Sequence, residues 1–320
     1  MRPGNLSVAI VLTAAVLVSA CSSATLSNGA ALAKTGQAAA TQMEQAATLS
    51  AATYTALKNA VTFDAGFAND IDDPDTQDFL KQEAQIQTAL SAYGTMLEKL
   101  GNAYAALGAL SSYDANGTFS SATSSLCGAA SNLVASMPKS GSTSTNICQG
   151  ASFGIGQIAS AFQAHQVVDA SNEIEAVLNA VIPVLSDPDR RNLIVLNGQL
   201  VQRQIVSAAK DLYASGIFSC GPLLTQLGAP LNLAPVSGAD GIVAKHANVQ
   251  RGCLAVVSGT AQDSVNAVGP AYDKSVAALS ALRDQHEKLK AGVPLDLDTI
   301  NMILANLQGA AAKLQPPKGK

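Results

Sequence analysis

The sequence predicts an all-α fold, a bundle of about eight helices built on long antiparallel hairpins. Apolar residues recur three and four positions apart over long stretches, which is the spacing of one face of a helix. Strand-like alternation is confined to two short segments, residues 242–249 and 254–257. The composition, 48% hydrophobic and 13% charged, is that of a folded body and excludes a mainly disordered chain.

The clearest helix is expected to begin after Asp73. Asp73 can cap it, Pro74 suits its first position, and Asp75 complements the positive end of the helix dipole. Its apolar residues then form a heptad seam, which consists of Phe79, Ile86, Leu90, Tyr93, Leu97, Leu100, Tyr104 and Leu107.

The helix before it has a seam of mostly small side chains that includes Ala40, Met43, Ala47, Tyr54 and Leu57. Small side chains bury little area each, so this helix needs a second helix lying close against it. A turn over residues 63–74 folds the two helices into a hairpin from Leu32 to Leu110. The seam is either internal core or an interface, and we interpret it as an interaction surface for another protein.

A second cycle resembles the first, because Asp187-Pro188-Asp189 repeats Asp73-Pro74-Asp75 after 114 residues. This repeat suggests an internally duplicated hairpin unit. Near the end, one helix is expected over residues 272–289, followed by a break at residues 292–294 and a last helix capped by Asp298. The predicted regions are 31–186 and 187–315, each with a disulfide loop, and a flexible tail at 316–320.

Residues 1–20 have the pattern of a secretory signal peptide, since Arg2 precedes an apolar run from Val8 to Val18 that is too short to span a bilayer. The stretch Val18-Ser19-Ala20-Cys21 resembles the lipobox of bacterial lipoproteins. That resemblance implies a diacylglyceryl group on the Cys21 thiol and cleavage just before it. Residues 21–30 would then be a lipidated N-terminus and short tether. The alternative is an ordinary secretory signal that leaves Cys21 as an unpaired thiol.

Four cysteines remain besides Cys21, an even number for an oxidising compartment. The sequential pairing closes two short loops, and we predict disulfides Cys127–Cys148 and Cys220–Cys253. A zinc site is the alternative, but no two cysteines have C-x-x-C spacing and none lies beside a histidine.

No catalytic pattern keeps its required context, and we predict neither an enzyme nor a cofactor. Gly150-Ala151-Ser152-Phe153-Gly154 matches G-x-S-x-G, but no strand is expected before it. The acidic run with Asp70, Asp72, Asp73 and Asp75 raises a calcium hypothesis, yet it lacks the central glycine and distal glutamate of an EF-hand loop. Helix capping explains most of these aspartates.

The predicted function is a lipid-anchored structural or protein-interaction component of the bacterial cell envelope. Its partners would be the membrane, through the anchor, and another envelope protein. The mature chain has 18 basic and 23 acidic residues, so binding of nucleic acid is not expected. Ser22 follows Cys21, which favours the outer over the inner membrane, with the body in the periplasm. The alternative is a binding module that holds a small apolar ligand or a cell-wall fragment between helices.

Overall fold

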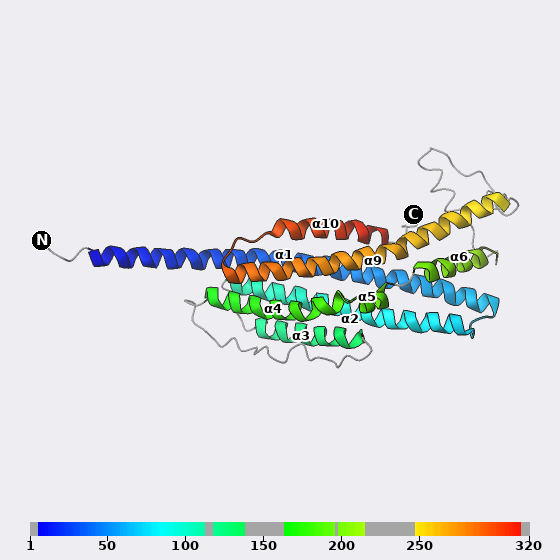
Figure 1. Ribbon diagram of the computed structural model, residues 1–320, viewed down its shortest axis with the longest axis horizontal. Helices are drawn as coiled ribbons and strands as arrows, with labels where there is room; N and C mark the ends of the chain where they lie inside the picture. The colour runs from blue at the N-terminus through cyan, green and yellow to red at the C-terminus, as the bar shows by residue number, and fades with distance from the viewer. Residues whose placement is uncertain (1–5, 113–117, 138–162, 196–197, 215–246, 315–320) are drawn as a thin grey trace. The chain divides into compact units, whose positions relative to one another are not determined.

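The computed structural model describes residues 6–112, 118–137, 163–195, 198–214 and 247–314, and in α1 it describes side chains from Ser23 onward. These residues form eight helices and no strand (Figure 1). The helices are α1 (Leu6–Ala68), α2 (Pro74–Ser111), α3 (Thr118–Ser136), α4 (Gln163–Leu185), α5 (Pro188–Ile194), α6 (Gly198–Ala214), α9 (Ala247–Ala291) and α10 (Leu297–Leu314). The predicted all-α bundle of about eight helices is confirmed.

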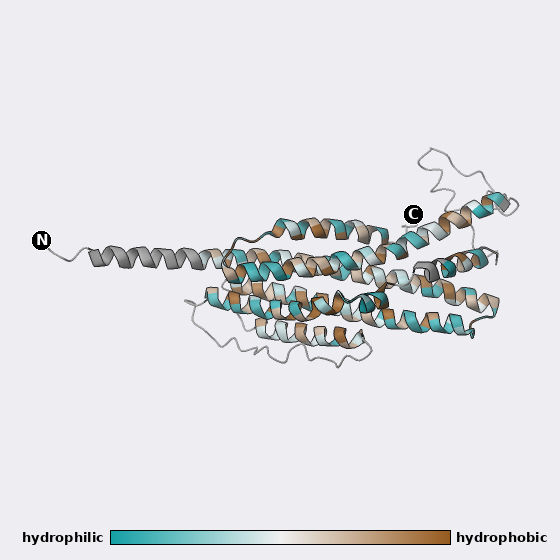
Figure 2. Ribbon diagram, in the orientation of Figure 1, coloured by the Kyte–Doolittle hydropathy of each residue, from teal (hydrophilic) through white to brown (hydrophobic). Residues whose placement is uncertain are grey.

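The heptad seam of α2 is buried along its whole length, since none of its eight side chains is more than 3% exposed. Figure 2 shows the expected alternation of hydrophobic and hydrophilic residues along the helices. The start of α2 is also as predicted. The Asp73 carboxylate accepts hydrogen bonds from the backbone N–H groups of Asp75 at 3.0 Å and Thr76 at 3.4 Å, which is the geometry of an N-cap.

The turn between α1 and α2 is shorter than predicted, because α1 continues to Ala68. Asn69 has a φ of 61°, the left-handed conformation that commonly ends a helix. The Asp70 N–H then donates to the Ala65 carbonyl at 2.8 Å, which closes the capping motif. The turn therefore occupies only residues 69–73.

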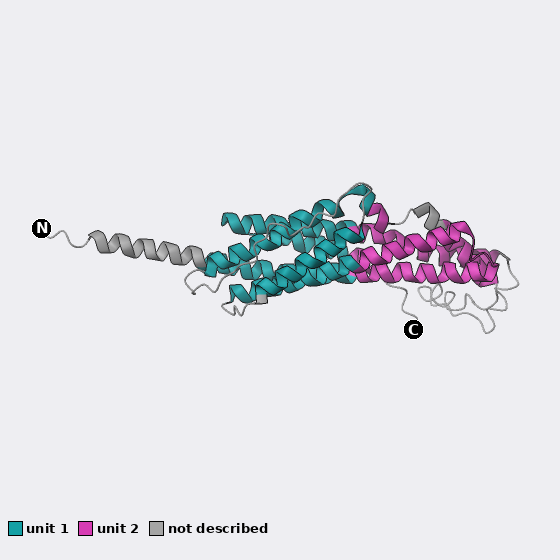
Figure 3. Cartoon of the chain, turned by 90° about the horizontal axis from the view of Figure 1, so that it is seen from below, with its two compact units in different colours: residues 1–45, 92–190, 273–307 teal, residues 46–91, 191–272, 308–320 magenta. Residues whose placement is uncertain are grey.

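The chain divides into two compact units that are not contiguous in sequence (Figure 3). Unit 1 contains residues 1–45, 92–190 and 273–307, and unit 2 contains residues 46–91, 191–272 and 308–320. One boundary, at residues 190 and 191, lies near the predicted division after Ser186. The units nevertheless differ from the predicted regions 31–186 and 187–315, because α1, α2, α9 and α10 each contribute to both.

The interpretation of the small-residue seam as an interaction surface is wrong. Its five side chains are internal core, with exposed fractions of 1% for Ala40, 0% for Met43, 5% for Ala47, 0% for Tyr54 and 7% for Leu57. The close partner that the small residues require is supplied by the chain itself. In unit 2 the Tyr54 hydroxyl donates to the Ile194 carbonyl at 2.8 Å.

In unit 1 the partner of α1 is α2, which runs antiparallel to it. Added Cβ atoms at Gly101 and Gly108 would lie 3.5 Å from Ala40 Cβ and 3.4 Å from Ala33 Cβ, so the two pairs are seven residues apart on each helix. In unit 2 the same two helices are joined by an ion pair of 3.2 Å between Lys58 and the buried Glu83. The predicted antiparallel hairpin is thus present within each unit.

The N-terminal tether predicted over residues 21–30 is helical instead, because α1 already includes these residues. The packing of α1 against the rest of unit 1 already begins within this segment. Gly29 is buried, and a Cβ added there would lie 2.5 Å from a Val167 methyl group and 2.8 Å from Ser111 Oγ. The alanines and serines of residues 22–30 are compatible with a helix, and packing of Gly29 against the α2 and α4 residues stabilises it.

The second Asp-Pro-Asp triplet repeats the cap of the first but not the long helix that follows. Asp187 Oδ1 accepts from the Asp189 N–H at 3.0 Å, as Asp73 does for Asp75. However, α5 has 7 residues whereas α2 has 38. The two sequences also differ, since Asn197-Gly198 stands 114 positions after Glu83-Ala84. Asparagine and glycine are weaker helix formers than glutamate and alanine.

Three predictions for the C-terminal region need correction. Residues 247–249 and 254–257, the described parts of the two segments with strand-like alternation, belong to α9, because alternation over so few residues does not distinguish strand from helix. The same helix begins at Ala247 rather than near residue 272, and it includes Pro270. The cap of α10 is Asp296 rather than Asp298, since Asp296 accepts from the Thr299 N–H at 3.3 Å and the Thr299 hydroxyl at 2.8 Å.

Candidate functional site

Three polar side chains from three helices meet in the core of unit 1. The Tyr104 hydroxyl of α2 lies 2.8 Å from His286 Nε2 of α9, and the Ser171 hydroxyl of α4 lies 2.6 Å from His286 Nδ1. The Tyr104 and His286 rings are stacked, with centroids 5.6 Å apart. All three residues are 0% exposed, so this buried triad has its polar groups satisfied internally.

Burial sets the protonation states of the buried triad. It lowers the pKa of His286 to about 3 and raises the pKa of Tyr104. Near neutral pH the imidazole is therefore uncharged, with one ring nitrogen donating and the other accepting. One hydroxyl then donates to the ring and the other accepts from it, so the three groups fix one another's orientation.

The buried triad contains residue types that hydrolases use, but its place in the fold argues for a structural role. A nucleophilic serine must be reachable by substrate, whereas Ser171 is fully enclosed. The helix predicted over residues 272–289 includes His286. The sequence did not indicate its two partners, because they lie 182 and 115 residues away along the chain.

A second cluster of note lies in unit 2, where Asp64 of α1 approaches Asp211 of α6. Burial, followed by the neighbouring Asp211, raises the pKa of Asp64 to about 6, while a hydrogen bond with Ser207 opposes this shift. Asp64 is 9% exposed, and its Oδ1 is buried without a hydrogen-bond partner within the described part of the chain. The sequence showed Asp64 in an acidic run but gave no sign that Asp211 lies beside it.

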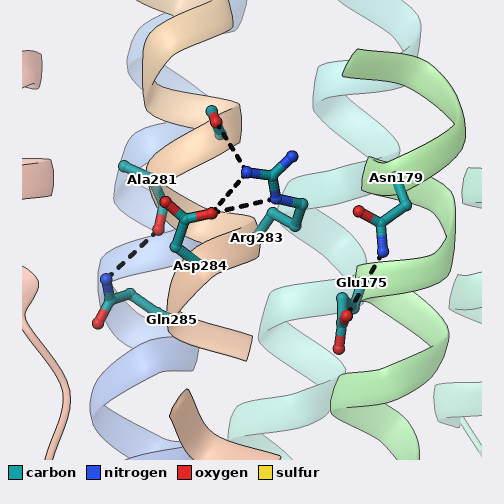
Figure 4. Close-up of polar contacts among 7 residues, drawn as sticks. Glu175, Asn179, Ala281, Arg283, Asp284 and Gln285 are labelled. Carbon is teal, nitrogen blue, oxygen red and sulfur yellow. Dashed lines mark hydrogen bonds and ion pairs between the residues drawn. The ribbon is translucent and has the colours of Figure 1, made fainter. Parts of the chain in front are cut away.

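Figure 4 shows charged and amide side chains of α9 and α4 and the polar contacts among them. Arg283 pairs with Asp284 of its own helix at 2.7 Å, and Glu175 accepts from Asn179 at 3.4 Å. Exposed contacts of this kind contribute little stability. The exception is the buried Gln285, whose side-chain oxygen accepts from the Asp296 N–H at 2.7 Å and so ties α9 to the start of α10.

The aspartates of the calcium hypothesis all lie at the start of α2 or in the turn before it. Asp70, Asp72, Asp73 and Asp75 are exposed, and Asp73 is engaged as the helix cap. Across the described residues, no three His, Cys, Asp or Glu side chains are grouped so that they could hold a metal ion. The structure therefore offers the calcium hypothesis no ligand cage.

Several of the predicted site residues, or their predicted partners, lie outside the described part of the chain. Cys21 lies within α1, ahead of the first described side chain. Cys127 in α3 and Cys253 in α9 are buried, at 3% and 4% exposed, but their predicted partners Cys148 and Cys220 lie outside the described residues. The predicted pairing stays a prediction. Ser152 and its flanking glycines also lie outside the described residues.

Comparisons with known proteins do not assign the chain to a family. No known family, curated protein or solved structure matches it. Within the described residues, none of the helices combines the length and apolar character needed to span a membrane.

Proposed function

We propose that the protein is a lipid-anchored helical component of the bacterial cell envelope with a structural or protein-interaction role. The observation that carries the proposal is the stretch Val18-Ser19-Ala20-Cys21 at the end of a short apolar run. In bacterial lipoproteins this pattern directs acylation of the cysteine. The proposal includes outer-membrane sorting, with the helical body in the periplasm.

The helical form of residues 22–30 supports a body held near the membrane surface. If Cys21 carries the lipid, the first fully buried large side chain of α1, Leu32, follows only eleven residues later. Eleven residues of helix extend about 16 Å, half of what a fully extended tether would allow. The anchor and the body would then be joined by a helix rather than by a loose linker.

The proposal also includes the two disulfides, because a periplasmic protein folds where thiols are oxidised. Pairing of Cys127 with Cys148 and of Cys220 with Cys253 would restrain the segments that leave α3 and enter α9. Each bridge would stabilise the fold by about 3 to 4 kcal/mol on the loop-entropy account.

The interaction role is favoured over the alternative of a ligand-binding module. A small-molecule site needs polar groups that converge on an accessible cavity. The polar groups that converge in unit 1 are Tyr104, Ser171 and His286, and they are enclosed and satisfied by one another. Because all three side chains are 0% exposed, they do not face an accessible cavity.

Metabolic labelling with palmitate tests the anchor. The native chain should take up label and fractionate with the outer membrane, whereas Cys21→Ala should take up none. Ser23→Ala, a change two residues away, is the matched control and should be labelled normally. A Cys21→Ala chain that still takes up label and stays in the membrane fraction would contradict the proposal. Ser22→Asp tests sorting, and it should move the labelled protein to the inner membrane.

A further inference from the structure

Three large apolar side chains at the end of the α1–α2 hairpin are exposed, two near the end of α1 and one in the turn that follows. Phe63, Phe67 and Ile71 are spaced four residues apart and are 43%, 56% and 39% exposed. Isolated exposed apolar residues are common, but a contiguous group of large ones is typical of an interaction surface. This segment, residues 63–78, is called the hairpin tip below.

The hairpin tip is also the most acidic part of the chain. Residues 59–80 contain six aspartates and no lysine, arginine or histidine, while the whole chain has a net charge of -4. The rest of the chain is therefore slightly basic. Like charges concentrated beside exposed aromatic rings destabilise the free protein and would be relieved by a cationic partner.

Folding explains only some of these aspartates. Asp73 caps α2, and Asp78 pairs with Lys81 at 3.3 Å. By contrast, the carboxylates of Asp70 and Asp72 take part in no hydrogen bond or ion pair with the rest of the described chain. These two side chains, both exposed, remain available for contacts with a partner.

The hairpin tip is a preformed surface. The Asp73 N–H donates to the Asp70 carbonyl at 3.0 Å, and the Gln77 side-chain amide donates to the Ile71 carbonyl at 2.8 Å. Together with the cap of α2 and the capping motif at Asn69, these bonds hold the turn in one conformation. A partner would meet a surface that needs little ordering on binding, which favours affinity.

We propose that the hairpin tip docks a cationic amphipathic helix of a partner protein. The apolar face of that helix would pack on Phe63, Phe67 and Ile71, and its flanking lysine or arginine side chains would pair with Asp70 and Asp72. The combination of exposed aromatic rings and unpaired carboxylates selects this chemistry. An acidic amphipathic segment would match only the rings, and a polar cationic segment would match only the carboxylates. This inference deepens the interaction role proposed above and identifies its surface.

Binding of a designed peptide to the full chain, purified in a non-ionic detergent, tests the docking site. The probe is a fluorescent amphipathic helix of about two heptads with leucine on one face and lysine on the other, and micelles alone give the blank. Its anisotropy should rise with the native chain. Phe67→Ser and the double variant Asp70→Asn/Asp72→Asn should each weaken binding by about tenfold, a loss typical of a central interface contact.

Matched variants on other helices distinguish docking from general attraction. Met302→Ser removes a side chain that is 61% exposed on α10, and Asp169→Asn/Asp263→Asn removes two exposed charges from α4 and α9. These controls should change the affinity by less than about twofold. The helicity and melting temperature of each variant are measured alongside. If Phe67→Ser proves to be unfolded, Phe67→Gln takes its place.

Three results would overturn the inference. The first is equal weakening by the control variants, and the second is loss of binding with the aspartate variant but not with Phe67→Ser, which would leave only charge attraction. The third is failure of the peptide to bind while millimolar calcium raises the melting temperature, which would assign the aspartates to a cation. None of these results depends on Cys21, so the docking surface is tested independently of the lipid anchor.

Discussion

Tyr104 packs directly on Gly36, so closely that a Cβ added to the glycine would overlap the tyrosine ring. The ring has no room to retreat, because its hydroxyl is bonded to His286 and its face is stacked on the imidazole. Gly36 is thus the position at which α1 meets the buried triad. Its lack of a side chain determines how closely α1 approaches α2 in unit 1.

Gly36→Ala should therefore destabilise the protein by about 1 to 3 kcal/mol, the usual cost of overpacking a core. Gly94→Ala is the matched control on α2, because a Cβ there would contact nothing within 4 Å. It should stabilise the helix by about 0.5 to 1 kcal/mol, since alanine is the better helix former. Denaturant unfolding measures both changes, and equal effects of the two variants would contradict the packing argument.

Sequence reasoning succeeded where a property is local. The heptad seam of α2, the cap at Asp73 and the hairpin all depend on spacing within one or two helical segments. The same locality accounts for the misplaced cap of α10, because Asp296 and Asp298 both suit that position and only the backbone decides between them. The end of α1 was predicted six residues too early for a similar reason.

The features that sequence reasoning missed depend on contacts between distant segments. A seam of small residues predicts a close neighbour but cannot say whether it belongs to the same chain, and here the chain supplies it. The partners of His286 and the approach of Asp211 to Asp64 likewise follow from tertiary packing. Neither contact can be predicted from the spacing of the residues involved.

Asp64→Asn is expected to stabilise the protein at neutral pH. Burial, followed by the neighbouring Asp211, raises the pKa of Asp64 from 3.8 to about 6 in the folded state, so folding is penalised once the group must ionise there. The penalty is absent below pH 3.8 and grows as the pH rises to about 6. The variant should gain about 1 kcal/mol at pH 7 and almost nothing at pH 4. Denaturant unfolding at the two pH values measures this difference, and a gain of equal size at both would contradict it.

Peptide mapping without reduction tests the predicted cysteine pairing. It should yield Cys127 joined to Cys148 and Cys220 joined to Cys253. Because Cys127 and Cys253 are only 3% and 4% exposed, both bridges should resist mild reductant until the protein is partly unfolded. A cross-link between Cys127 and Cys253 would contradict the pairing, and rapid reduction of the folded protein would contradict the burial.

His286 makes the stability of the protein sensitive to acid. An unfolded histidine titrates near pH 6.5, but in the folded state burial lowers the pKa of His286 to about 3. Well above pH 6.5 the imidazole is therefore neutral in both states, and as the pH falls through 6.5 the unfolded chain binds a proton that the folded protein does not bind. Native stability should fall by about 2 kcal/mol between pH 6.5 and pH 5 from this residue alone.

His286→Gln removes the titrating group while keeping an amide that can bond to Tyr104 and Ser171. The variant should be less stable than the native protein at pH 7.5, because a glutamine does not reproduce the stacked ring. Its stability should nevertheless decline less between pH 6.5 and pH 5, so that the two curves converge as the pH falls. His165→Gln, at an exposed position on α4, is the control and should leave the slope unchanged. Parallel curves for the native protein and His286→Gln would show that the imidazole is already reachable by protons, and the enclosed triad would then be incorrect.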